Sequence, residues 1–350
     1  MGYGGSSDGG SGYRRVGDDR TANLKVDNIT NRDGSGGTEV DGIVKVNSTA
    51  HFIPPSGTTA ERGSRGRGVF GDGYASPAVT NFIEYITIAT LGNASDFGDL
   101  SVARDLLTPA ASSTRGIFAG SGNPTYSNII DYITIPSTGN SFDFGDLLEG
   151  IYSAGGCSDE TRGVFAGGRT PTKAASDVIQ YITISSLGNT SEFGSLTYGR
   201  RHVGGLSSPT RGVFGSGSPT SNSIDYITIQ TLGDAQDFGD LVTSKQDTAG
   251  CSNKIRGLFV GGNSNTIEYI TISSLGDAID FGDLSLNVDY AGALASSTRG
   301  VFHCSDAPAS NNVLEYVSIM STGNASDFGD LVNPRIYGGG SLSDSHGGLG

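Results

Sequence analysis

The chain has 350 residues with 56 glycines and no tryptophan, and its 36 acidic against 22 basic side chains give a net charge of −14. This charge repels phosphate backbones and anionic membranes, which argues against nucleic-acid binding. No apolar run approaches the about 20 residues of a membrane helix, and residues 1–12 hold no apolar stretch that could serve as a signal peptide. We therefore expect a soluble protein made in the cytoplasm, without membrane insertion.

Residues 1–66 form a region distinct from the rest of the chain. They hold eight basic and eight acidic side chains, so the net charge resides in residues 67–350. Residues 1–21 are rich in Gly and Ser and predict a flexible tail that buries no core. Residues 22–66 hold short strand-like runs, which are marginally stable alone. We therefore expect this β-rich segment to become ordered by pairing with another chain, as an attachment segment.

Residues 67–350 contain an internal repeat built from three sequence blocks. Arg-Gly-x-Phe occurs six times, with its arginine at Arg67, Arg115, Arg162, Arg211, Arg256 and Arg299. Tyr-Ile-Thr-Ile or a near copy follows, with its tyrosine at Tyr85, Tyr132, Tyr181, Tyr226, Tyr269 and Tyr316. Asp-Phe-Gly-Asp-Leu or a variant comes third, with its phenylalanine at Phe97, Phe144, Phe193, Phe238, Phe281 and Phe328. The lengths vary only between the first and second blocks, which predicts one variable loop per repeat.

Each repeat is expected to form four short strands. Residues 83–88 are β-branched and aromatic, residues 68–71 run into a Gly-rich turn, and Phe97 with Leu100 belongs to a third strand. The fourth precedes each Arg-Gly-x-Phe, where small residues allow backbones to converge. Six such repeats predict an all-β, six-bladed β-propeller around a central channel. A linear solenoid is the alternative.

The ends of the repeat region predict how the ring closes. The first Arg-Gly-x-Phe is not preceded by an innermost-strand pattern, whereas residues 335–342 supply an extra copy of it. We therefore expect this segment to complete the first blade. Residues 346–350 fall where a seventh Arg-Gly-x-Phe would begin, and are interpreted as a truncated copy.

Two resemblances follow from these blocks. The order of a small-residue inner strand, a Gly-Gly-type turn, a tyrosine-containing strand and a closing aromatic strand resembles the kelch family of propellers, without its usual tryptophan. Asn-Ala-Ser-Asp-Phe-Gly-Asp-Leu (93–100 and 324–331) and Ser-Ser-Thr-Arg-Gly-x-Phe (112–118 and 296–302) resemble virion proteins of marine bacteriophages, especially cyanophages. Residues 24–62 are similar to a module that opens many phage structural proteins.

The phage resemblance implies a virion component. Its expected partners are other virion proteins, bound through the N-terminal segment, and a glycan or protein of the host surface. We expect a non-enzymatic tail, fibre or surface appendage protein that displays the propeller in several copies, so that weak contacts gain by avidity. One alternative is a purely structural knob or joint of the particle. Another is a glycan-degrading enzyme, which would need a non-repeated acid and base facing each other.

The variable loops are expected to surround one face of the propeller, because loops between the second and third strands emerge beside the connectors between blades. Their Ser, Asn, Thr, Gly and Tyr residues suit polar contacts with sugars or proteins. The loops are 71–82, 119–129, 166–178, 215–223, 260–266 and 303–313. The candidate binding residues on or near this face are Tyr74, Arg104, Tyr126, Asn128, Arg169, Arg200, Asn222, Lys245, Asn265, Asn312 and Arg335.

The repeated polar residues have simpler interpretations than catalysis. The Arg of Arg-Gly-x-Phe recurs in every repeat, which favours pairing with carboxylates or carbonyls of a neighbouring blade. Asp96 and Asp99 could hold calcium, although turn capping is the simpler role. No cofactor or metal is expected.

The cysteines and histidines are also interpreted as structural or surface residues. Cys157 and Cys251 occupy one repeat position and are expected to pack in the core, whereas Cys304 could be exposed. The histidines have no metal-ligand spacing and are expected at surface or loop positions; they are His51, His202, His303 and His346.

Overall fold

The computed structural model describes residues 66–71, 73–75, 78–305, 310–337 and 340–349. The predicted tail (residues 1–21) and, apart from Gly66, the predicted attachment segment (residues 22–66) lie outside the described residues. The described residues all belong to one compact unit, which is described by itself. Among the described residues no helix is long and apolar enough to cross a membrane.

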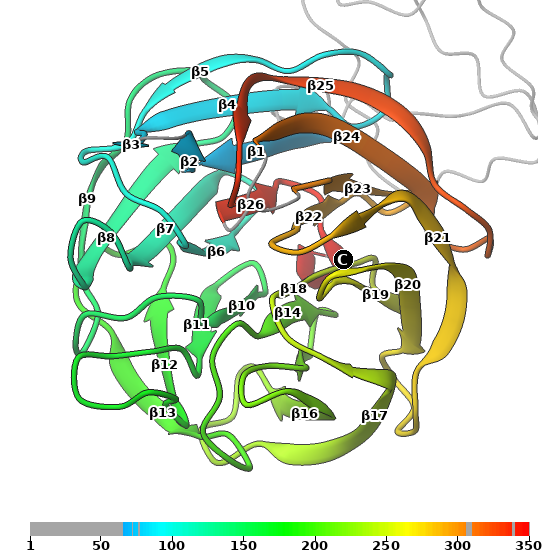
Figure 1. The fold of residues 1–350 in the computed structure, drawn as a ribbon. Helices are drawn as coiled ribbons and strands as arrows, with labels where there is room; N and C mark the ends of the chain where they lie inside the picture. Colours follow the sequence, from blue (N-terminus) through cyan, green and yellow to red (C-terminus); the bar gives the residue numbers. More distant parts are fainter. Residues whose placement is uncertain (1–65, 72, 76–77, 306–309, 338–339, 350) are drawn as a thin grey trace, which may run out of the picture. The chain divides into compact units, whose positions relative to one another are not determined.

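In the described part of the chain, six four-stranded antiparallel sheets surround a central channel as blades (Figure 1). From the innermost strand outwards, blade 1 contains β26 (Gly340–Ser343), β1 (Arg67–Gly71), β4 (Phe82–Thr87) and β5 (Ser95–Asp99). Blade 2 contains β6 (Thr108–Ala111), β7 (Arg115–Ser121), β8 (Ser127–Thr134) and β9 (Phe142–Asp146). Blade 3 contains β10 (Gly155–Ser158), β11 (Arg162–Ala166), β12 (Val178–Thr183) and β13 (Ser191–Ser195).

The second half of the ring repeats this order. Blade 4 contains β14 (Gly204–Ser207), β15 (Arg211–Gly215), β16 (Ser221–Thr228) and β17 (Gln236–Lys245). Blade 5 contains β18 (Thr248–Ser252), β19 (Arg256–Gly261), β20 (Ser264–Thr271) and β21 (Ile279–Val288). Blade 6 contains β22 (Gly292–Ala295), β23 (Arg299–His303), β24 (Asn311–Ser318) and β25 (Ser326–Arg335). A short hairpin of β2 (Tyr74–Ala75) and β3 (Ala78–Val79) precedes β4. The all-β, six-bladed propeller is therefore confirmed.

Blade 1 closes the ring by combining distant parts of the chain. Its innermost strand β26 pairs antiparallel with β1, so that Gly68 faces Ser343 and Gly71 faces Gly340. The prediction that residues near the C-terminal end of the repeats complete the first blade is confirmed. The same pairing excludes an open solenoid, because blades 1 and 6 become neighbours.

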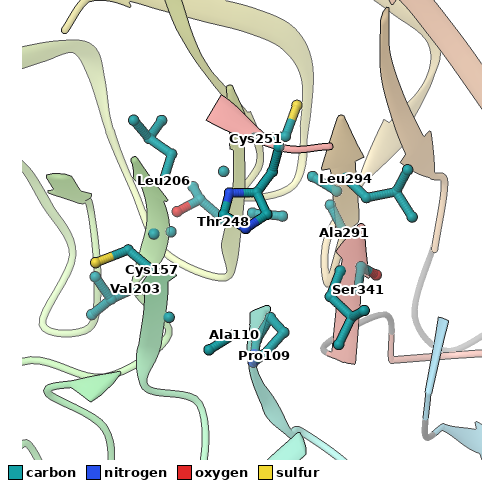
Figure 2. Close-up of a pocket in the computed structure, with 18 of the residues that line it drawn as sticks. Pro109, Ala110, Cys157, Val203, Leu206, Thr248, Cys251, Ala291, Leu294 and Ser341 are labelled. Carbon is teal, nitrogen blue, oxygen red and sulfur yellow. The ribbon is translucent and has the colours of Figure 1, made fainter. Parts of the chain in front are cut away.

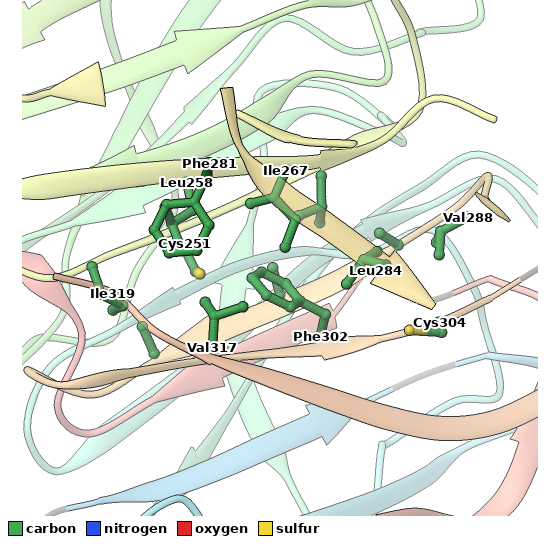
Figure 3. Packing of buried hydrophobic residues seen from close by; sticks show 14 residues of the cluster. Cys251, Leu258, Ile267, Phe281, Leu284, Val288, Phe302, Cys304, Val317 and Ile319 are labelled. Carbon is green, nitrogen blue, oxygen red and sulfur yellow. The ribbon is translucent and has the colours of Figure 1, made fainter. Parts of the chain in front are cut away.

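The hydrophobic core lies between neighbouring blades. Figure 3 shows Leu258 and Phe281 of blade 5 packed with Phe302 and Val317 of blade 6. Cys304 belongs to the same cluster and is 1% exposed, so the expectation of an exposed thiol is wrong. Its place after a buried strand, beside an apolar cluster, explains the burial.

The repeated arginines tie each blade to the next. Arg67 places its guanidinium 4.4 Å from the ring centre of Tyr85 in its own blade, and its Nη1 donates to the Ile135 carbonyl of blade 2 at 2.7 Å. The last arginine of the series, Arg299, donates to the Ile88 carbonyl at 2.9 Å and so links blade 6 to blade 1. The predicted pairing with a neighbouring blade's carbonyls is confirmed.

The Asp-Phe-Gly-Asp blocks form a second set of contacts between blades. Gly98 has φ of 149°, and a Cβ there would lie 2.4 Å from the Gly139 carbonyl oxygen of the next blade. The Asp99 amide donates to the Asn140 side chain at 3.1 Å. The capping group is thus the Asn or Asp after the turn glycine of the next blade, not the Asp of the block itself.

Residues 344–349 cross one end of the channel. Asp344 Oδ1 accepts hydrogen bonds from the Gly66 amide at 2.6 Å and the Arg67 amide at 3.0 Å. His346 Nε2 donates to the Ala111 carbonyl at 3.0 Å. The following 3-10 helix, Gly347–Leu349, is so close to the inner strands that a Cβ on Gly347 would lie 2.3 Å from the Ser207 carbonyl oxygen. The interpretation as a truncated seventh repeat is wrong, because this segment closes the channel instead of forming a strand.

Candidate functional site at the channel mouth

The inner strands surround a cavity of about 130 Å³ (Figure 2). Its wall consists mainly of small and apolar residues, including Pro109, Ala110, Val203 and Leu206. His346 lines the end that residues 344–349 close. Each inner strand begins at the opposite end, which is called the mouth below and which lies beside the variable loops.

One repeat position supplies a different residue to the mouth from each blade. This position lies nine residues after the Phe of Asp-Phe-Gly, immediately before the inner strand. Its six occupants are Leu106, Ser153, His202, Asp247, Tyr290 and Tyr337. All but the last line the cavity. The repeated scaffold therefore brings six neighbouring positions together, and their chemistry differs around the ring.

Aromatic side chains form a continuous series across the mouth. The series is called the aromatic arc and consists of Tyr126, Tyr152, His202, Tyr290, Tyr337 and Tyr74. The His202 ring centre lies 6.2 Å from that of Tyr152 and 5.8 Å from that of Tyr290. Tyr290 and Tyr337 lie 4.6 Å apart, with their planes at 80°. The tyrosines are partly exposed, so rings and hydroxyls can contact a ligand.

His202 and Asp247 contact each other at the centre of the arc. The distance from His202 Nδ1 to Asp247 Oδ1 is 2.5 Å, and the side chains are 12% and 4% exposed. Because the two ring nitrogens lie on opposite edges of the imidazole, this contact turns Nε2 away from Asp247. Asp247 thus fixes the orientation of a ring that can exchange hydrogen bonds or a proton with a ligand.

Carboxylates surround the Tyr290 and Tyr337 end of the arc. Burial raises the pKa of Tyr290, and the nearby Asp247 and Asp289 raise it further. Burial also raises the pKa of Tyr337, with Asp105 as the largest charged contributor. Both phenols therefore keep their protons at neutral pH and act as hydrogen-bond donors.

Asp105 is a fully buried carboxyl beside this end of the mouth. Asn123 Nδ2 donates to its Oδ2 at 2.8 Å, whereas its Oδ1 has no hydrogen-bond partner among the described residues. Burial raises its pKa above the ordinary value, and the bonds from Asn123 only partly oppose this shift. The other end of the arc carries opposite charge, since Arg169 Nη1 donates to the Tyr152 hydroxyl at 3.2 Å.

Three of the residues predicted from the sequence join this site. Tyr74 and Tyr126 are the two ends of the arc, and Arg169 bonds to its member Tyr152. Sequence reasoning missed five residues of the site, because they lie in segments of constant length that predict scaffold; they are Tyr152, His202, Asp247, Tyr290 and Tyr337. The signal that could have found them is the variation of side-chain type at a position of fixed spacing.

The four other basic candidates are not surface contacts. Each is buried and forms an ion pair with an acid of the following blade, which also accepts backbone or side-chain hydrogen bonds. The pairs are Arg104–Asp131 at 2.9 Å, Arg200–Asp225 at 2.9 Å, Lys245–Glu268 at 2.8 Å and Arg335–Glu84 at 3.0 Å. The expectation that these side chains are accessible is therefore wrong. Their burial is explained by the acid that precedes the block tyrosine of the following blade; these acids are Glu84, Asp131, Asp225 and Glu268.

The asparagine candidates occupy one repeat position. All lie four residues before a block tyrosine, in strands next to the outermost ones; they are Asn128, Asn222, Asn265 and Asn312. Asn265 Nδ2 donates to the Leu284 carbonyl at 3.4 Å, and Asn312 Nδ2 to the Leu331 carbonyl at 3.2 Å. These bonds assign Asn265 and Asn312 to the scaffold, whereas Asn128 is exposed on β8 and stays a candidate for ligand contact.

One of the histidines differs from expectation. His303 is buried in β23 instead of lying at the surface, and burial lowers its pKa. His346 lies in the loop before the 3-10 helix, and burial lowers its pKa as well. Among the described residues, no group of three or more His, Cys, Asp or Glu side chains could hold a metal ion.

No protein-family model matches the chain, and the search of curated proteins found no match.

Proposed function

We propose that this chain is a non-enzymatic component of a bacteriophage particle that displays its propeller to recognise a glycan on the host surface. The aromatic arc is the observation that carries the recognition half of the proposal. The resemblance of the repeats and of residues 24–62 to phage virion proteins supports the particle half. In this proposal residues 22–66 dock on other virion proteins, and the mouth faces outwards.

The composition of the arc suits a sugar ligand. Tyrosine rings offer flat apolar faces to the C–H side of a sugar, and their hydroxyls exchange hydrogen bonds with sugar hydroxyls. His202, oriented by Asp247, adds a polar group between the rings. A concave apolar site with a few fixed polar groups is the usual form of a small-ligand site. Several copies on one particle would raise weak individual affinities by avidity.

A binding experiment tests the recognition half. The full chain, immobilised at high density, is exposed to surface polysaccharides isolated from marine cyanobacteria. We expect a Tyr152→Ala, Tyr337→Ala double variant to lose binding by about ten-fold or more, because two aromatic stacking faces are removed. Leu275→Ala is the control, since Leu275 is 58% exposed in the turn between β20 and β21, away from the arc. Unchanged binding by the double variant would contradict the proposal.

The particle half needs separate tests. Deleting residues 1–62 is expected to leave a folded propeller that no longer enters particles, and continued incorporation would refute the role of the attachment segment. A map of the intact particle tests the orientation. An arc covered by a neighbouring virion protein would favour the purely structural role.

A glycan-cleaving enzyme is the second candidate, favoured by the non-repeated His202–Asp247 pair. A histidine held by a carboxylate can accept a proton during catalysis. Incubation of the same polysaccharides with the full chain, followed by an assay for new reducing ends, tests this candidate. Cleavage that is lost in His202→Asn would replace the non-enzymatic proposal.

A further inference from the structure

Most cations of the propeller are engaged by its scaffold. Residues 67–350 contain 14 basic side chains. The six repeated arginines donate to carbonyls of neighbouring blades, four cations form the buried ion pairs, and Lys173 is paired with Asp177. The three that remain are Arg169, Arg201 and Lys254. Because Lys254 lies at the closed end, in the turn between β18 and β19, the two remaining cations at the mouth are Arg169 and Arg201.

Arg169 lies beside the aromatic arc, in the loop between β11 and β12. Its backbone pairs with that of Tyr152 in an isolated β-bridge, and its Nη1 donates to the Tyr152 hydroxyl at 3.2 Å. Arg169 and Tyr152 are partly exposed, and the ring centre of the exposed Tyr126 lies 5.4 Å from that of Tyr152. No carboxylate oxygen of the described residues lies within 4.0 Å of the Arg169 guanidinium. A ligand on the arc can therefore reach a cation that is in no ion pair with the described part of the chain.

The bond to Tyr152 leaves one edge of the guanidinium available. Nη1 donates to the phenol, whereas Nε and Nη2 have no hydrogen-bond partner among the described residues. The N–H groups of Nε and Nη2 point in parallel and match the two oxygens of a carboxylate, which they bind through two hydrogen bonds. Because the Tyr152 oxygen accepts from Arg169, its own proton remains for a ligand oxygen. The pair thus offers donors only, and an ionised carboxylate offers acceptors only.

Arg201 adds positive charge on the same side of the mouth. It directly precedes His202 of the arc, and its Nη1 donates to the Ala174 carbonyl at 2.9 Å, in the loop that also holds Arg169. A carbonyl carries no net charge, so this bond fixes the side chain of Arg201 without cancelling its charge. Two cations are therefore held by the same loop.

The acids bonded to this loop do not offset both arginines. Asp177 is paired with Lys173 of the same loop at 3.1 Å, and Glu149 accepts a hydrogen bond from Thr172 Oγ1 at 3.4 Å. Within the described part of the chain, Glu149 is thus the one carboxylate bonded to the loop without an ion pair. The net charge of −14 repels an anion, but at physiological ionic strength this repulsion is largely screened beyond about 8 Å. The contact with the guanidinium therefore decides.

The position of Arg169 differs from blade to blade. It lies four residues after the Phe of Arg-Gly-x-Phe, where the six repeats carry Tyr74, Gly122, Arg169, Ser218, Asn263 and Asp306. The repeated scaffold therefore does not require an arginine there. Variation at a position of fixed spacing is also what distinguishes the members of the arc, so Arg169 shares their pattern.

Building on the glycan recognition proposed above, we propose that Arg169 and Tyr152 bind the carboxylate of an acidic sugar, a uronic acid unit of the recognised glycan. The free edge of the guanidinium receives the two carboxylate oxygens, the charge of Arg201 strengthens the contact, and the rings of Tyr126 and Tyr152 pack on the sugar. A neutral sugar of the same shape gains only the ring contacts. The site thereby distinguishes acidic from neutral glycans.

Two oligosaccharides that differ only in charge test the inference. The full chain is titrated by calorimetry at neutral pH with an α-1,4-linked galacturonic acid tetramer and with its fully methyl-esterified counterpart. We expect the acidic tetramer to bind about ten-fold more tightly, the factor that a hydrogen bond to a charged group contributes. The preference should weaken with added salt.

Variants show whether Arg169 causes the preference. Arg169→Met should abolish it, and Arg169→Lys, which keeps the charge without the two parallel donors, should retain only part of it. Lys254→Met is the matched control, because it removes the same charge from an exposed residue at the closed end and should keep the full preference. Thermal melting of each variant verifies that the propeller remains folded.

The outcomes separate this inference from the proposed function. Equal binding of the two tetramers, failure of the acidic tetramer to bind, or an unchanged preference in Arg169→Met overturns the inference and leaves glycan recognition intact. An equal loss in Lys254→Met would assign the preference to net charge, and a full preference in Arg169→Lys would exclude the two-bond contact; either result also overturns it. If the Tyr152→Ala, Tyr337→Ala double variant in addition binds host polysaccharide normally, the proposed function falls as well.

Discussion

The two ends of the channel are built by the same six repeats but by opposite rules. At the closed end every blade presents the same Arg-Gly-x-Phe arginine over a tyrosine, and residues 344–349 pack against the inner strands. At the mouth the position nine residues after the Phe of Asp-Phe-Gly carries leucine, serine, histidine, aspartate or tyrosine, depending on the blade. A residue that every blade repeats holds neighbouring blades together, whereas a residue that differs at a fixed position is free to serve recognition.

The buried ion pairs recur in several blades but not in all six. Breaking one of them should give the largest effect on stability. Arg200→Ala leaves the fully buried Asp225 without its cation. We expect the free energy of unfolding to fall by about 3 to 5 kcal/mol in a denaturant titration. Lys173→Ala is the matched control, because the Lys173–Asp177 pair is 49% and 45% exposed and is expected to contribute less than about 1 kcal/mol. Equal losses of stability in the two variants would contradict the larger contribution expected of the buried ion pair.

His303 should make the propeller sensitive to acid. Burial, together with the nearby Arg335, lowers the pKa of His303 from 6.5 to about 4. The unfolded chain therefore binds a proton at a higher pH than the folded chain, so stability falls as the pH falls from about 6.5 to 4, by about 3 kcal/mol. Unfolding curves across this range measure the loss, which should diminish in His303→Gln. If the free energy of unfolding of His303→Gln depends on pH as it does in the unaltered protein, other groups cause the loss of stability.

A repeated arginine should have a smaller effect, confined to stability. Arg256→Met removes the contact at 4.2 Å to the Tyr269 ring and the hydrogen bond to the Ile319 carbonyl at 3.0 Å. We expect a loss of about 1 to 2 kcal/mol. Glycan binding should remain unchanged, because the residue lies at the closed end. Reduced glycan binding by a folded Arg256→Met variant would contradict the assignment of this arginine to the scaffold alone.

The smallest expected effect has the opposite sign. Burial raises the pKa of Asp105, so its charged form opposes folding at neutral pH. Asp105→Asn should therefore slightly raise the melting temperature at neutral pH, with a gain that disappears as the pH falls below the folded pKa of the carboxyl. A clearly destabilised variant would indicate that Asp105 belongs to the scaffold.

Much of the fold could be predicted from the sequence, because constant spacing between blocks reports the constant geometry of a blade. The blade count, the closing strand and the carbonyl partners of the repeated arginines all follow from that regularity. The mouth could not be identified in the same way, since spacing says nothing about side chains that differ. The burial of Arg104 and Lys245 was also missed, because their acids are near in space only after the blades pack.

The pairing of β1 with β26 also affects how the protein is made. Val69 emerges from the ribosome long before its partner Leu342, so the nascent chain carries β1 with an unpaired inner edge through most of its synthesis. Such an edge can pair with other chains. A chain that ends before residue 340 would therefore lack the inner strand of blade 1. Its β1 edge would stay unpaired and prone to pair with other chains, although the other five blades would be complete.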